Sequence, residues 1–80
     1  MLTIYAVVGQ DLKLFTSRLE AIKHILNEGK HYDIDYWDDV SGWVPVQSLE
    51  ETDLLNLSDE EINTVFDGCC EISTHCLKLD

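Results

Sequence analysis

The residues best suited to binding a metal ion are three cysteines and a histidine near the C-terminus. Cys69, Cys70, His75 and Cys76 are the side-chain types that hold Zn²⁺ in tetrahedral sites. Zinc ligand pairs are usually separated by about two to four residues, whereas here the members of each pair are adjacent. Neighbours on a strand point to opposite faces. We therefore predict no metal site, with Cys70 and Cys76 in the core, Cys69 at a turn and His75 facing solvent.

A second metal-like pattern is the run of Asp33, Asp35, Asp38 and Asp39. An EF-hand calcium loop needs a glycine at its sixth position and a glutamate at its twelfth. Asp38 and Val44 occupy those positions, so this is not an EF-hand. Weak Ca²⁺ or Mg²⁺ binding to the carboxylates stays open, and we predict no cofactor.

Catalysis is not indicated by any motif in the chain. The sequence has no phosphate loop, nucleophile elbow or dinucleotide fingerprint. We expect His24 on the polar side of a helix and His31 just after that helix. A carboxylate pair that acts as acid and base needs a pocket in which the two groups are differently solvated, and a domain this small has little room for one. The sequence therefore favours a protein that is not an enzyme.

The strongest chemical signal is the distribution of charge. The segment from His31 to Leu77 holds twelve of the sixteen acidic residues and no lysine or arginine, and the net charge is −11. Such a surface repels DNA, RNA and anionic membranes and attracts a basic protein surface. The alternative is that the charge only keeps a small protein soluble and monomeric.

Two tryptophans, Trp37 and Trp43, flank the acidic turn 38–42. They either cover the end of a small core or serve as anchors of an interface, where tryptophan is enriched. In the second case, carboxylates would stand where phosphates normally bind, held by arginine side chains. We predict a partner-binding set of Asp33, Asp35, Trp37, Asp38, Asp39, Trp43, Glu50, Glu51 and Asp53.

In composition alone, the chain resembles small acidic inhibitors of phages and mobile elements, or antitoxins and immunity proteins paired with nucleases. The first hypothesis is an anti-defence inhibitor, for example an anti-CRISPR protein, that blocks a basic nucleic-acid-handling protein by mimicking DNA. An antitoxin or nuclease immunity protein is the second, and a small structural or regulatory subunit with incidental acidity is the third. We expect a monomer or homodimer.

The compartment is predicted from cysteine content and hydropathy. An odd number of cysteines, three, favours a reducing cytoplasm. We see no secretory signal and no apolar run long enough to span a membrane. The chain starts with Met1 and ends after its last predicted strand, so we expect a complete small protein.

The elements that position these residues begin with a strand and a helix. Eighty residues make one domain. Alternation over 2–8 with apolar residues on both faces predicts a central strand, and 12–15 a return strand. Ser17 and Glu20 have capping-box spacing, and the apolar pattern predicts a helix over 18–28 that ends at Gly29 in the left-handed conformation.

The second half of the chain is predicted to form a hairpin, an acidic helix and a last strand. Residues 32–37 alternate between an apolar and an acidic face, and 43–46 read as an edge strand because of Pro45. Residues 47–57 stay unassigned, although Ser48 and Glu51 permit a helical turn. Ser58 and Glu61 predict an acidic helix ended by Gly68, and 70–77 a strand. The predicted fold is α+β: a small antiparallel sheet (ββαββ, short acidic helix, final β) packed on one main amphipathic helix.

Overall fold

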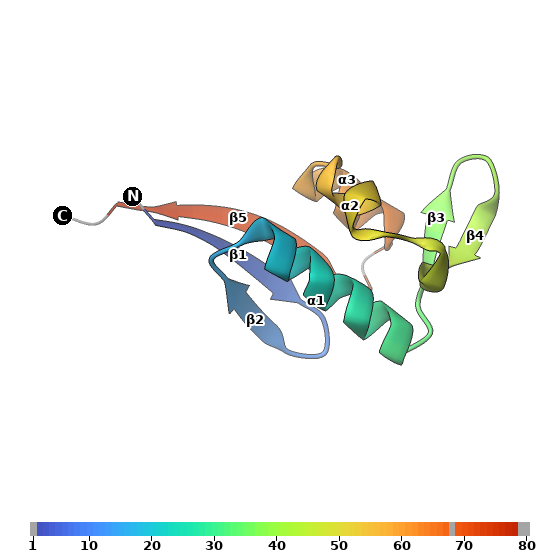
Figure 1. Cartoon of the computed structure of the whole chain (residues 1–80), viewed down its shortest axis with the longest axis horizontal. Coiled ribbons are helices and arrows are strands. Elements are labelled where there is room, and N and C mark those ends of the chain that lie inside the picture. Colours follow the sequence, from blue (N-terminus) through green and yellow to red (C-terminus); the bar gives the residue numbers. More distant parts are fainter. Residues whose placement is uncertain (1, 68, 79–80) are drawn as a thin grey trace.

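The central strand of the molecule is β1 (Leu2–Val8), which pairs antiparallel with β2 (Leu12–Phe15) on one side and β5 (Glu71–Leu77) on the other (Figure 1). This is a computed structural model, and it describes residues 2–67 and 69–78. The fold is α+β, as predicted, and the central position of β1 is confirmed. The β1–β5 pairing is long and in register from Leu2↔Leu77 to Val8↔Glu71.

One face of this sheet is covered by helix α1 (Arg18–His31). Ser17 caps the helix by accepting the N–H of Glu20 at 3.4 Å. The helix buries Ala21, Ile22, Ile25 and Leu26 in a core cluster that also contains Val7 and Ile72 of the sheet. Burial of each large aliphatic side chain contributes roughly 1.5–3 kcal/mol, so this cluster stabilises the helix against the sheet.

The predicted end of α1 is wrong, and packing explains the difference. The helix continues through Gly29 to His31, and Gly29 is buried. A Cβ at this position would lie 3.1 Å from both methyl groups of Val46. Glycine is therefore needed for close approach, and it is Asp33, with φ of 53°, that has the left-handed backbone.

The remaining strands form a separate hairpin of β3 (Asp35–Asp38) and β4 (Gly42–Pro45), where one sheet was predicted. β3 starts at Asp35, later than predicted, because the turn after α1 occupies Tyr32 and Asp33. Val46 leaves the strand for a 3₁₀ turn, η1 (Val46–Ser48), and is fully buried in the core. In Figure 1 the hairpin lies at the opposite end of the molecule from the two termini.

Two short helices fill the space between hairpin and sheet. Helix α2 (Glu51–Leu55) begins in the segment left unassigned, and its N-cap is Glu50, not Ser48. Helix α3 (Asp59–Val65) begins with the predicted capping box of Ser58 and Glu61. The predicted terminator, Gly68, lies outside the described residues. None of the helices in the described ranges is long and apolar enough to cross a membrane.

Helix α3 is tied to the rest of the molecule by polar side chains. The Arg18 guanidinium contacts Asp59 Oδ1 at 2.6 Å and donates to the Leu57 carbonyl at 2.6 Å. The Asn63 side chain donates to the Ile72 carbonyl and accepts the Ile72 N–H. Asp59 therefore has a structural role at the first turn of a helix, as predicted, and α3 is fixed to both α1 and β5.

Candidate functional site

The β3–β4 hairpin is held by hydrogen bonds at its base and at its tip. At the base, the Ile34 N–H donates to the Gly29 carbonyl at 2.9 Å, and the Val46 N–H to the Ile34 carbonyl at 3.2 Å. At the tip, Asp38 Oδ1 accepts the N–H groups of Val40 at 2.7 Å and Ser41 at 3.0 Å. These two bonds stabilise the carboxylate and lower the pKa of Asp38. Asp38 is therefore a turn-forming residue as well as a charge.

The two faces of the hairpin differ in chemistry. Tyr36 and Val44 form one cross-strand pair, and Tyr36 packs against the core. Trp37 and Trp43 form the next pair and point the other way, with exposed fractions of 42% and 52%. Their ring centroids are 5.3 Å apart in an edge-to-face arrangement at 73°, a favourable geometry for aromatic pairs. Both tryptophans are therefore on an exposed face.

Carboxylates border this tryptophan pair. The Trp37 indole N–H donates to Asp39 Oδ1 at 3.0 Å. Asp35 lies two residues before Trp37 on the same strand, hence on the same face, and is exposed. We call Asp35, Trp37, Asp39 and Trp43 the tryptophan face. It combines two large aromatic surfaces with two negative charges.

A groove of about 580 Å³ lies beside the tryptophan face, between the hairpin and helices α2 and α3. Its apolar lining includes Leu49, Leu54, Leu57 and Val65, and its acidic lining comprises Asp38, Asp39, Glu60 and Glu61. Among the described residues that line it, none is basic. Burial, and then the nearby Asp38 and Asp53, raise the pKa of the Tyr36 hydroxyl at this groove. The groove therefore joins an apolar floor to a negative rim.

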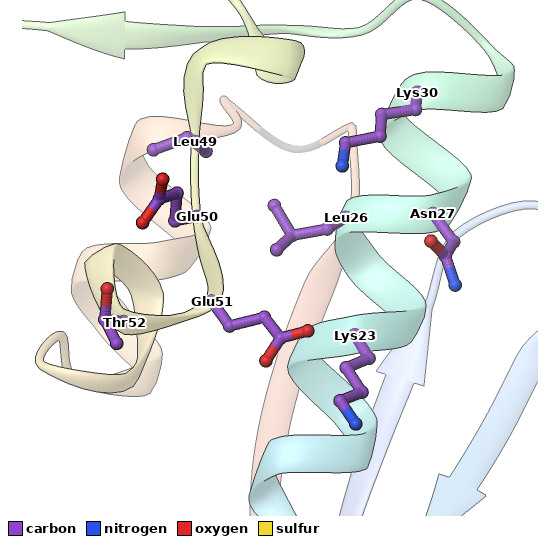
Figure 2. Close-up of a pocket in the computed structure, with 8 residues that line it drawn as sticks. All are labelled: Lys23, Leu26, Asn27, Lys30, Leu49, Glu50, Glu51 and Thr52. Atoms are coloured by element: carbon purple, nitrogen blue, oxygen red, sulfur yellow. The ribbon is translucent and has the colours of Figure 1, made fainter.

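The remaining predicted site residues lie elsewhere. Glu50 and Glu51 line a second groove of about 600 Å³, between α1 and α2, together with Lys23 and Lys30. Figure 2 shows Glu51 extending across this groove toward Lys23. The charges there are mixed, so this groove does not extend the negative surface.

Asp33 and Asp53 have local roles. Asp33 sits in the turn after α1, where its Oδ1 accepts from the Gln47 side chain at 3.4 Å. Asp53 Oδ2 accepts the Glu50 N–H at 2.8 Å and so supports the start of α2. The predicted set is thus divided between the tryptophan face, the turns next to it, the start of α2 and the α1–α2 groove.

No protein-family model, no curated protein and no solved structure matches this chain. Its function is therefore inferred from the charge and geometry of the described residues.

Sequence reasoning missed the groove and two of its acidic residues. Glu60 and Glu61 were explained by the helix dipole at the start of α3, and that explanation still holds. In addition they face the groove with Thr64 and Val65, one turn further along the helix. The one-turn spacing was visible in the sequence. The position of α3 beside the hairpin was not, because it depends on tertiary contacts between Asn63 and β5.

The cysteines and histidines are dispersed. Cys70 is buried, and burial, with smaller contributions from Cys69 and Glu71, raises its pKa to about 11. Cys76 is exposed, contrary to the prediction, because the end of the β1–β5 ribbon projects beyond α1 (Figure 1). His24 lies 5.3 Å from the Phe15 ring and 3.6 Å from Glu28. Within residues 2–67 and 69–78, no three His, Cys, Asp or Glu side chains are grouped to hold a metal.

Proposed function

We propose that this protein is an inhibitor that binds a basic surface of a nucleic-acid-handling protein and competes there with the nucleic acid. The observation that carries the proposal is the tryptophan face beside a groove with an acidic rim, on a segment without lysine or arginine. Exposed aromatic pairs are favoured binding anchors. The charge around them selects a basic partner.

The geometry suits arginine in particular. A guanidinium stacks on an indole face and forms paired hydrogen bonds to a carboxylate. Trp37 and Asp39 are already joined at 3.0 Å, so an aromatic face and a carboxylate are presented together. The adjacent groove offers the partly exposed Leu57 and Val65 to an apolar side chain of the partner. Charge steers the encounter, and burial of the aromatic and apolar surface supplies affinity.

The proposal needs no cofactor and no catalytic step. It includes a reducing, cytoplasmic compartment, supported by the free thiols of Cys69 and Cys76, both exposed. Competition follows from shared chemistry, since arginine and lysine side chains that bind phosphates also bind carboxylates.

The test is displacement of host proteins from duplex DNA. Proteins of a host extract are bound to DNA beads at low salt, the purified protein is added, and the proteins released are identified. Asp35→Lys with Asp39→Lys changes the net charge by the same amount as the control Asp11→Lys with Glu20→Lys. Asp11 and Glu20 are exposed and lie outside the tryptophan face. Asp38 and Asp33 are kept because they form turns.

We expect a DNA-bound protein that is released by the wild type and by the control. The variant with Asp35→Lys and Asp39→Lys should be needed at a concentration at least about tenfold higher for the same release. Each carboxylate that no longer pairs with a basic side chain of the partner costs roughly 1 kcal/mol or more. Direct binding of the released protein to the wild type, measured without DNA, should weaken steeply as salt rises. Equal release by the two variants would show that net charge alone, and not this face, carries the effect.

A further inference from the structure

The outer face of the three-stranded sheet, on the side away from α1, is apolar. Side chains of Val7 and Ile72 point to the helix side and are buried. The strand register places the alternate residues on the opposite face. Its apolar members are Leu2, Ile4, Ala6, Val8, Leu12, Leu14 and Leu77. We call this the leucine face, and none of the described helices covers it.

The exposure of this face is large for a protein of this size. Leu12 and Leu14 are each 61% exposed, Val8 is 48% and Leu77 is 45% exposed. An apolar patch of a few hundred Å² on a monomer usually marks an interaction site. Two such faces with their rims reach the roughly 1,000 Å² of total buried surface that a specific interface requires.

The charge of the leucine face identifies its occupant. Of the chain's sixteen acidic residues, Glu71 stands on this face, at its margin opposite Val8. The other polar members are Ser73 and His75. Their side chains form a hydrogen bond with each other, with 2.9 Å between Oγ and Nε2. A single carboxylate at the margin is too little charge to attract a basic partner. It can meet an identical face with little of the repulsion that a chain of net charge −11 otherwise generates.

We propose that the leucine face binds a second copy of this chain. A two-fold axis brings the same patch of each copy together, and the two sheets then pack face to face about 10 Å apart. The acidic hairpin lies at the other end of a molecule 48 Å long (Figure 1). The hairpin charges are therefore held away from the contact, and salt, with a Debye length of about 8 Å, screens the repulsion that remains.

Sedimentation equilibrium of the purified protein tests the proposal without any partner protein. We expect a concentration-dependent mass that approaches twice the 9.2 kDa of the chain. Leu14→Glu and, separately, Leu12→Glu should raise the dimer dissociation constant at least tenfold, because the two-fold axis introduces each new charge twice into an apolar contact. The matched control is Val40→Glu, at a hairpin-tip residue that is 95% exposed and lies outside the leucine face.

Salt provides a second readout. Added salt screens the repulsion between two acidic copies and should tighten the dimer, whereas it would weaken a contact made by opposite charges. Circular dichroism melting verifies that each variant is folded. A wild type that stays at 9.2 kDa up to about 1 mM, a concentration at which even weak dimers form, would overturn the proposal. So would a dimer that Leu14→Glu and Val40→Glu affect equally.

Discussion

The two ends of the molecule expose opposite kinds of surface. The hairpin end presents Trp37 and Trp43 among carboxylates, next to an acidic groove. The sheet end presents aliphatic side chains with one carboxylate, Glu71, at their margin. The net charge of −11 is therefore distributed unevenly over the surface, which solubility alone does not require. Aromatic side chains are exposed where the charge is dense, and aliphatic ones where it is sparse.

The two ends are also stabilised over different sequence distances. The hairpin tip is built within a few residues, by the bonds from Val40 and Ser41 to Asp38. The sheet joins the first and last parts of the chain, with Leu2 opposite Leu77. A substitution in the hairpin should therefore act locally, whereas the sheet forms only with the whole fold.

The largest expected effects come from one substitution on the tryptophan face and one on the leucine face, each of which should weaken a different binding affinity. Trp43→Ala should weaken binding to the partner identified by DNA displacement by about 2–4 kcal/mol, or at least about 30-fold, the usual size for an aromatic anchor. It should leave the dimer dissociation constant unchanged. Leu14→Glu should do the reverse. Calorimetric titration and sedimentation equilibrium measure the two affinities, and either substitution weakening both would show that the surfaces are not independent.

A smaller effect is expected at the connection between the two ends. Asn63 of α3 makes two hydrogen bonds to the backbone of Ile72 in β5, at 3.1 Å and 2.7 Å. Asn63→Ala leaves these partly buried backbone groups unsatisfied and should lower the free energy of unfolding by about 1–3 kcal/mol. Urea unfolding measures the change.

Asn63→Asp is the matched variant for this connection. Its carboxylate can still accept the Ile72 N–H but no longer donates to the Ile72 carbonyl, so its loss of stability should be intermediate. Equal stability of Asn63→Ala and the wild type would mean that the apolar contacts alone hold α3 against the sheet.

The difference between the two ends also separates what sequence patterns predict from what they do not. Period-two alternation located β1 and β5, and capping-box spacing located the starts of α1 and α3. These signals are local, and the α+β fold follows from them. The end of α1 was wrong because the requirement for Gly29 comes from Val46, a residue distant in sequence.

Non-local contacts also limited the prediction of the candidate site. The acidic turn and its tryptophans were recognised from composition, and their exposure was left open because it depends on which hairpin face meets the core. The groove was missed because it needs the hairpin and α3 side by side. Glu51 was assigned to the acidic surface because nothing local indicates that Lys23 lies across from it.

The smallest expected effect concerns pH and is confined to the hairpin tip. Because the pKa of Asp38 is lowered in the folded state from its ordinary value of 3.8, its contribution to stability is fully present above that value. It is lost as pH falls through the lowered pKa. The circular dichroism signal of the coupled Trp37–Trp43 pair should therefore be constant from neutral pH to about pH 4 and decline below 3.8.

Asp38→Asn separates the titration of this side chain from general acid unfolding. Its amide oxygen can still accept the N–H groups of Val40 and Ser41 but does not titrate. The tryptophan signal of the variant should persist to lower pH than that of the wild type, while the far-ultraviolet signal of both proteins changes together. If the tryptophan signals of the two proteins decline at the same pH, the tip is lost only with the whole fold, and the hairpin is not the locally determined end of this molecule.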